Sequence, residues 1–183
     1  MDRKWDHLQL VRICQLMKEE NYPLSKISLQ EILYILQEIY GVKSTYDFKL
    51  FTYGPYSIRL TEDLDMLLAR RILSQEYCQG PVHYGFRLLP GENYKLAYFT
   101  NYQDILEGYE ERLKRVVQLF GRHSARDLEL RAALIFLSVR YGIKKEALVE
   151  KIQSIKGYFK REEVKEALLE LAEIPEIREK IKE

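Results

Sequence analysis

Few side chains in this sequence have the types and spacing that catalysis or metal binding requires. The three histidines, His7, His83 and His123, lie far apart, and none stands at metal-ligand spacing from Cys, Asp or Glu. Cys14 could pair with a remote histidine as a nucleophile, but it falls on the apolar side of a helical pattern, which favours a small buried hydrophobic residue. No glycine-rich phosphate loop is present. The sequence therefore predicts no enzyme activity, no catalytic residue, no cofactor and no metal site.

Basic residues gather in one part of the sequence, where they could bind an acidic partner or a phosphate backbone. Between residues 112 and 131, six basic side chains stand against only two acidic ones. Cations also collect at helix ends because they complement the helix dipole, so a purely structural role stays open. The basic residues of this stretch are Arg112, Lys114, Arg115, Arg122, Arg126 and Arg131. The predicted contacts for nucleic acid or an acidic partner are Arg70, Arg71, Arg87, Arg112, Arg115, Arg122 and Arg126.

Tyrosine is unusually abundant, with 14 residues in the chain and a concentration in its middle third. A tyrosine buries a large area and keeps a polar tip, which suits interfaces. The alternation along residues 46–53 turns Phe51 and Tyr53 outward if Phe48 points into the core. Such an aromatic face must be covered either by the helices after residue 100 or by another molecule. The predicted partner-binding residues are Phe51, Tyr53, Tyr56 and Arg59.

The elements that must position these residues follow from periodicity and turn signals. The period-2 alternation predicts a strand over residues 46–53, which Gly54-Pro55 is expected to end. The Ser57 hydroxyl is expected to cap the following helix, and Ser28 with Glu31 to form a capping box at the start of the second helix. The helices are expected at residues 3–20, 28–41, 58–71, 101–120 (capped by Asn101), 124–142 (opened by Ser124), 144–155 and 161–173, with a short final helix from Pro175 and two further strands at 72–78 and 82–89.

The fold class predicted from this order is mainly α with a small β wing (α+β). The order helix, helix, strand, helix, strand, turn, strand is that of a winged helix. We expect a winged-helix-like module at residues 1–100, packed on a helical unit at residues 101–183. In a DNA-binding winged helix the third helix enters the major groove. Two acids on the outer face of that helix would repel phosphate here, so DNA binding is the alternative rather than the leading prediction. That outer face is predicted to be Arg59, Glu62, Asp63, Met66 and Arg70.

Composition sets the remaining limits. The chain has 183 residues, 46% of them apolar, and a net charge of +1, so no global attraction to nucleic acid or acidic membranes is expected. Two cysteines, Cys14 and Cys78, are too few for a disulfide framework and predict reduced thiols in a cytoplasmic protein. No apolar run reaches the length of a membrane span and no secretory signal is apparent. The oligomeric state does not follow from these features.

Two stretches of the sequence resemble a known family. Residues 29–37 (LQEILYILQ) and 46–57 (YDFKLFTYGPYS), followed by Leu60 and residues 63–65, resemble the YwgA-like family of uncharacterised prokaryotic proteins and, more remotely, the Panacea domain of SocA-like antitoxins. Residues 128–137 and the corner at residues 156–159 fit the YwgA-like pattern in the second half. Glu31 stands where these families usually have lysine, and Gly157-Tyr158 where they have Pro-His.

The resemblance implies no catalytic residue and, for the YwgA-like family, no established activity. For the Panacea group it implies a mostly helical domain that neutralises toxins by direct protein contact. The predicted function is therefore a non-enzymatic, cytoplasmic binding protein of antitoxin or regulator type, whose partner is another protein such as a toxin. The alternative is a DNA-binding transcriptional regulator of winged-helix type.

Overall fold

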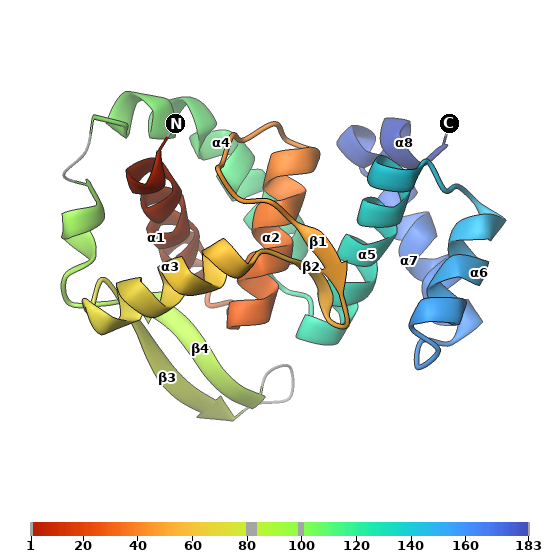
Figure 1. The fold of residues 1–183 in the computed structure, drawn as a ribbon, viewed down its shortest axis with the longest axis horizontal. Coiled ribbons are helices and arrows are strands. Elements are labelled where there is room, and N and C mark those ends of the chain that lie inside the picture. The colour runs from red at the N-terminus through yellow and green to blue at the C-terminus, as the bar shows by residue number, and fades with distance from the viewer. Residues whose placement is uncertain (1, 80–83, 99–100, 183) are drawn as a thin grey trace.

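The computed structural model describes residues 2–79, 84–98 and 101–182. Over these residues the chain is mainly helical with two small antiparallel sheets, which confirms the predicted α+β class with a minor β part (Figure 1). No helix in these ranges is long and apolar enough to span a membrane. The helices are α1 (Arg3–Glu19), α2 (Lys26–Glu38), α3 (Ile58–Ala69), the 3-10 turn η1 (Tyr94–Tyr98), α4 (Gln103–Phe120), α5 (Ala125–Tyr141), α6 (Glu146–Ile155), α7 (Arg161–Glu173) and α8 (Pro175–Lys182). The strands are β1 (Lys49–Phe51), β2 (Gly54–Tyr56), β3 (Leu73–Gln79) and β4 (Tyr84–Pro90).

Helix α2 is the element on which the two halves of the chain meet. Figure 1 shows it at the centre of the molecule, between α1 and α5, and it also contacts α4. Tyr34 of α2 is buried, and its ring centroid lies 5.5 Å from that of Phe48 and 5.3 Å from that of Phe136 on α5. The hydrophobic core therefore runs from the first hundred residues into the C-terminal helices, where α6, α7 and α8 pack around α5.

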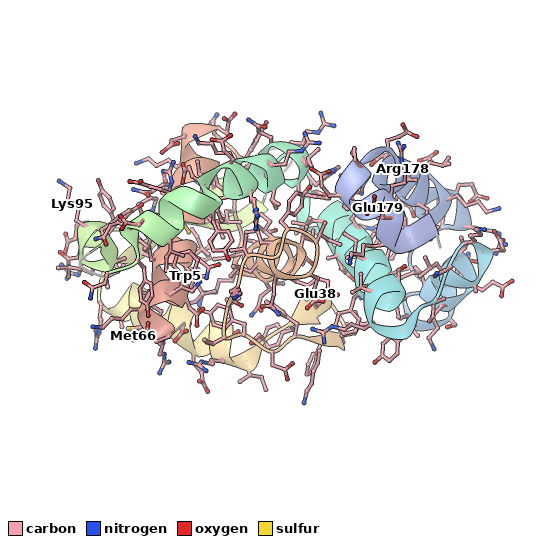
Figure 2. All side chains as sticks on the ribbon, turned by 90° about the horizontal axis from the view of Figure 1, so that it is seen from above. Trp5, Glu38, Met66, Lys95, Arg178 and Glu179 are labelled. Carbon is pink, nitrogen blue, oxygen red and sulfur yellow. The ribbon has the colours of Figure 1, made fainter. Side chains whose placement is uncertain are left out.

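Helix α1 is anchored by its single tryptophan. Trp5 is fully buried and lies on α1 between α3 and α4 (Figure 2), with its ring against those of Tyr102 and Tyr109. Its indole N–H donates to the carbonyl oxygen of Lys43 at 2.6 Å. A buried indole N–H needs such a partner, so the loop after α2 is fixed against α1 at this point.

Two predicted helix starts are wrong. Ser25, rather than Ser28, is the N-cap of α2, and its hydroxyl accepts the backbone N–H of Ser28 at 2.9 Å. The two serines stand three residues apart, so either could have been the cap, and Glu31 falls inside the helix. Helix α4 begins at Gln103 with Tyr102 as its N-cap and no side-chain capping bond, so the cap lies one residue later than the predicted Asn101. Ser124 does cap α5, as expected, by accepting the backbone N–H of Asp127.

The predicted strand at residues 46–53 is also wrong in its extent. Only Lys49–Phe51 is strand, and it pairs with Gly54–Tyr56 in a tight hairpin, so Gly54-Pro55 belongs to the second strand instead of ending the first. In a two-stranded sheet both strands are edges, where a proline without an N–H is tolerated. Gly54 has a φ of +102°, a conformation that only glycine adopts readily.

Ser57 precedes α3 as predicted, but its hydroxyl makes no capping hydrogen bond. The buried carboxamide of Gln30, on α2, satisfies the backbone here instead. Its oxygen accepts the N–H of Ser57 at 2.9 Å, and its nitrogen donates to the Ser57 carbonyl at 3.1 Å and to the Thr61 hydroxyl at 3.0 Å. Gln30 therefore joins α2 to the junction between β2 and α3.

This arrangement predicts that Gln30→Ala destabilises the protein far more than Ser57→Ala. Gln30→Ala leaves the buried N–H of Ser57 without its acceptor, and leaves the Ser57 carbonyl with only the Thr61 N–H at 3.3 Å, which should lower the free energy of unfolding by about 1–3 kcal/mol. Ser57→Ala removes a hydroxyl that does not cap the helix and should cost less than about 0.5 kcal/mol. Urea unfolding of both variants measures the difference. Equal losses would mean that the serine hydroxyl caps α3 after all.

The strands β3 and β4 form a second antiparallel hairpin in which Tyr77 lies opposite Phe86. The two strands predicted at residues 72–78 and 82–89 are thus confirmed with small shifts of their ends. Residues 80–81 of the predicted turn at residues 79–81 lie outside the described residues. His83 and the start of the strand predicted at residues 82–89 also lie outside them. Figure 1 shows both hairpins on the same side of the molecule.

Candidate binding site

The hairpin β1–β2 presents aromatic side chains to solvent. Phe51 is 50% exposed and Tyr53 is 63% exposed, whereas Phe48 is buried, which confirms the predicted outward and inward positions of these residues. The Phe51 ring packs edge-on against that of Tyr56 across the hairpin, with centroids 5.6 Å apart. With Ile27 and Gln30 of α2, residues 51–56 enclose a pocket of about 250 Å³. We call these three aromatic residues and this pocket the hairpin rim.

The structure brings together three of the four predicted partner-binding residues. Arg59 is exposed but does not line the pocket. It lies on α3, where its positive charge acts on the buried groups Asp6 and Tyr46. Burial raises the pKa of the Asp6 carboxyl, and the hydrogen bonds from Thr45 and the charge of Arg59 oppose that rise only in part. The charge of Arg59 therefore acts on Asp6 and Tyr46, and Arg59 does not belong to the hairpin rim.

A buried ion pair holds the hairpin from below. The Lys156 ammonium, in the corner between α6 and α7, lies 2.6 Å from a carboxylate oxygen of Glu129 on α5, and the two side chains are only 3% and 8% exposed. The same ammonium donates to the backbone carbonyl of Thr52 at the hairpin tip, and the Tyr158 hydroxyl donates to Glu129. The hairpin tip is thus tied to α5 and to the corner between α6 and α7.

A second carboxyl group lies beside this pair without a hydrogen bond. Glu31 is fully buried on α2, and neither of its carboxyl oxygens has a hydrogen-bond partner. Burial, with a smaller contribution from the negative charge of Glu129, holds the pKa of Glu31 well above its usual value, while Lys156 opposes the rise. Glu31 is therefore protonated at a pH where an ordinary glutamate is charged. We call Glu31, Glu129, Lys156 and Tyr158 the carboxylate cluster.

The backbone at Gly54 covers the carboxylate cluster. A Cβ atom at Gly54 would stand 3.0 Å from the Glu31 Oε1 and 3.7 Å from the Glu129 Cγ. The backbone of β2 can therefore lie directly over both carboxyl groups only because residue 54 has no side chain. The hairpin rim and the carboxylate cluster are two faces of one unit, joined through Gly54 and Thr52.

The sequence did not reveal the carboxylate cluster, because its members come from three distant segments. Glu31 was assigned to a helix cap, and Glu129 was counted only as an acid within a basic stretch. One signal could have identified both. Each stands within a helix that is apolar on nearly all sides, among residues such as Leu29 and Ile32 or Leu128 and Leu130. An acid with apolar residues on nearly all sides of its helix is expected to be buried.

Carboxylates distant in sequence balance part of the positive charge of the predicted basic patch. Arg126 lies 2.7 Å from Glu163 on α7, and Arg131 pairs with Glu170 on the same helix. Arg115 lies 3.5 Å from Glu176 on α8. The remaining contacts join Lys114 to Glu110 and Glu111, Arg112 to the carbonyl of Tyr40, Arg71 to Glu92 and Arg87 to Glu76. Arg122 lies exposed between α4 and α5, and Arg70 lines a small pocket with Lys4 and His7.

Asp63 was predicted on the outer face of α3 and is instead fully buried. It accepts a hydrogen bond from the Tyr46 hydroxyl at 2.9 Å and pairs with Arg3. His7, expected on the surface of α1, places its Nε2 atom 3.2 Å from the same carboxylate, with a side chain only 17% exposed. Through these three neighbours, the buried Asp63 joins α1 to α3. Of the two acids predicted on the outer face of α3, only Glu62 is exposed.

Cys14, the cysteine weighed as a nucleophile, lies in the hydrophobic core. Cys14 is buried, and burial raises the pKa of its thiol to about 12, which agrees with its assignment as a hydrophobic core residue. Within residues 2–79, 84–98 and 101–182, no three His, Cys, Asp or Glu side chains converge in a way that could hold a metal ion. Comparisons with protein-family models and with curated proteins returned no match. The resemblance to the YwgA-like family therefore stays a prediction.

Proposed function

We propose that this protein is a non-enzymatic binding protein of antitoxin or regulator type, which binds another protein through the hairpin rim. The observation that carries the proposal is the exposure of Phe51 and Tyr53, which none of the helices after residue 100 covers. Aromatic side chains contribute most to binding energy when they surround a pocket that a partner can fill. The rim offers such a pocket, lined by Phe51, Tyr56 and Ile27.

The anchoring of the hairpin supports the same proposal. Lys156 binds the Thr52 carbonyl and Gln30 binds both backbone groups of Ser57, so the segment that bears the rim is fixed at both ends. A surface that is ordered before binding loses less conformational entropy when the partner arrives. In this proposal the carboxylate cluster has a structural role, which is to hold the rim in a shape ready for binding.

Substitution of the rim should separate binding from folding. Tyr53→Ala should weaken binding to the partner at least tenfold, a loss of about 1.4 kcal/mol, because the side chain is exposed and free to contact it. The melting temperature should stay within about 2 °C of wild type. The natural first partner to test is the product of a neighbouring reading frame, produced together with this protein and measured by biolayer interferometry.

Phe86→Ala is the matched control, since Phe86 is an aromatic residue that is 58% exposed but lies on β4, in the other hairpin. It should leave both affinity and melting temperature unchanged. Loss of affinity in both variants, or in neither, would contradict a binding site at the hairpin rim. A neighbouring gene whose product is toxic and is neutralised by this protein would support the antitoxin form of the proposal.

The order of elements from α1 to β4 supports a winged-helix-like module at residues 1–100 with a C-terminal helical unit at residues 101–183. It also supports the alternative function, a DNA-binding transcriptional regulator, in which β3–β4 would act as the wing. On the exposed surface of α3, Arg59 and Arg70 alternate with Glu62 and Asp65, and Asp65 pairs with Lys26 at 2.7 Å. A surface of mixed charge gives little attraction to phosphate, which leaves protein binding as the better-supported function.

We therefore expect no duplex DNA binding tighter than about 10 μM at physiological salt, the range of non-specific contact. Fluorescence anisotropy with random and genomic duplexes, repeated over a series of salt concentrations, measures this. Sequence-dependent binding below 1 μM, with an affinity that falls steeply with salt, would favour the DNA alternative. Two free cysteines support a cytoplasmic location for either function.

A further inference from the structure

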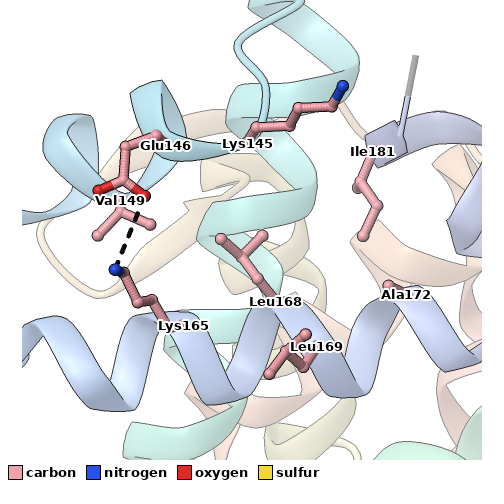
Figure 3. Close-up of a pocket in the computed structure, with 8 residues that line it drawn as sticks. All are labelled: Lys145, Glu146, Val149, Lys165, Leu168, Leu169, Ala172 and Ile181. Carbon is pink, nitrogen blue, oxygen red and sulfur yellow. Dashed lines mark ion pairs between the residues drawn. The ribbon is translucent and has the colours of Figure 1, made fainter.

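A second apolar surface lies at the far end of the molecule, among α6, α7 and α8. A groove of about 390 Å³ has walls formed by Val149 of α6, Leu168 and Ala172 of α7 and Ile181 of α8 (Figure 3). Leu169 lines the same groove and is 69% exposed, the highest exposure among the large hydrophobic side chains of the described residues. Exposure of the Leu169 side chain to water is unfavourable, and a bound partner would remove this apolar surface from water.

The charges around the groove are mostly positive. Figure 3 shows Lys145 extending along one edge toward Ile181, and Lys165 at the other edge facing Glu146. Among the described residues that line the groove, Glu146 is the only acid, and it pairs with Arg161 as well as with Lys165. Lys145 has no ion pair with any described residue. Two lysines thus stand against one carboxylate among the described residues that line the groove, which leaves Lys145 available for an acidic group.

The backbone at Lys145 supports a binding role. Its φ is +51°, one of only three positive values among the non-glycine residues described, and its side chain does not cap α6. A positive φ is unfavourable for a residue with a side chain, and such backbone strain clusters at functional sites. A glycine at this position would relieve the strain.

We propose that this groove binds an amphipathic helix of a partner protein, whose leucine-type side chains fill the groove and whose acidic residues contact Lys145 and Lys165. A helix that lies in a groove between helices presents apolar residues at i, i+3 or i+4 and i+7, and charged residues beside them. An acyl chain with a carboxylate head shares this chemistry, but small ligands bury most of their surface, and the exposed Leu169 leaves this groove open along one side. The groove lies apart from the hairpin rim, and the inference does not depend on the function proposed above.

The probe is a labelled 16-residue helical peptide with leucines at i, i+3 and i+7 and glutamates beside them, compared with a version that has lysines in place of the glutamates. Fluorescence anisotropy should show at least tenfold tighter binding of the acidic peptide. Amide chemical-shift changes in the ¹⁵N-labelled protein should cluster around Leu169 and Lys145. Leu169→Glu should weaken binding at least tenfold without changing the melting temperature, because that side chain is exposed.

Lys145→Gly is the decisive variant, because it removes the cation and relieves the backbone strain at the same time. It should weaken binding of the acidic peptide about tenfold while the melting temperature stays equal or rises. Lys151→Ala, an exposed lysine of α6 outside the groove, is the matched control and should change neither.

Several results would overturn the proposal. Equal affinity for the acidic and basic peptides, or no shift around Leu169 at 1 mM peptide, would exclude the acidic helix. Displacement of the peptide by decanoate at comparable concentration would indicate an acyl-chain site instead. Self-association in analytical ultracentrifugation that Leu169→Glu abolishes would identify the occupant as a second copy of this chain.

Discussion

Lys156→Met should lower the free energy of unfolding by about 3–5 kcal/mol, a large part of the total stability of a domain of this size. Methionine preserves most of the volume but removes the positive charge that lies 2.6 Å from Glu129. The Glu129 carboxylate would then remain buried beside Glu31 with only the Tyr158 hydroxyl as a donor. The Thr52 carbonyl would also lose its partner at the hairpin tip. Urea unfolding at neutral pH measures the loss.

The control for this prediction is an ion pair of similar length at the surface. Lys26 lies 2.7 Å from Asp65, but these side chains are 37% and 62% exposed, so Lys26→Met should cost less than about 1 kcal/mol. Glu129→Gln introduced into the Lys156→Met protein should restore at least about 1 kcal/mol, because it removes the charge left without a partner. Similar losses of stability for Lys26→Met and Lys156→Met would mean that burial does not strengthen the ion pair between Lys156 and Glu129.

Lys156 also fixes the hairpin rim, so its effect on global stability can be compared with its effect on the local order of the hairpin. If the hairpin tip is held by Lys156, the variant should show faster amide hydrogen exchange at Thr52 and Tyr53 than at buried residues of α2. Partner binding by the rim should weaken in this variant although no rim side chain has changed. Tyr53→Ala, in contrast, should weaken binding and leave the exchange rates of its neighbours unaltered.

The parts of the fold that the sequence predicted well are those set by local patterns. Ser124 caps α5, and Gly142, with a φ of +64°, ends it, because a hydroxyl before a helix and a glycine after it act within one turn of chain. Phe48 is buried and Phe51 is exposed, as period 2 predicts, whereas Tyr53 is exposed because it lies in the turn between β1 and β2. The sequence therefore predicted the exposed aromatic residues but not the pocket that they form with Ile27 and Gln30.

The parts that were mispredicted depend on contacts between distant segments. Ser57 had the sequence of an N-cap, but the carboxamide of Gln30, 27 residues earlier, binds the backbone there. Asp63 was expected to be exposed on an amphipathic helix and is buried because Tyr46 and Arg3 supply donors from other elements. The basic residues from 112 to 131 looked unpaired because their carboxylate partners lie on α7 and α8. Local sequence cannot show which distant side chain will satisfy a polar group.

Glu31→Gln should stabilise the protein, and the gain should grow as the pH rises. The buried Glu31 carboxyl has a pKa well above the ordinary value of 4.5, so the folded state binds its proton more tightly than the unfolded state does. Between pH 4.5 and the raised pKa, the folded protein holds more protons, and its stability falls with increasing pH by as much as about 1.4 kcal/mol per pH unit. Above the raised pKa the loss is complete and stays constant.

Glutamine cannot ionise, so the variant lacks this contribution. The difference in unfolding free energy between Glu31→Gln and wild type, measured in urea at pH 5, 6, 7 and 8, should therefore increase in favour of the variant as the pH rises. Other titrating groups are present in both proteins, so their contributions cancel in the difference. One of them is His123, whose pKa is lowered to about 4 by burial. Glu20→Gln, at an exposed position of the α1 C-cap, is the charge-matched control. A difference that stays constant from pH 5 to pH 8 would show that Glu31 is not held protonated beneath Gly54, and the carboxylate cluster would then need another source of compensating charge.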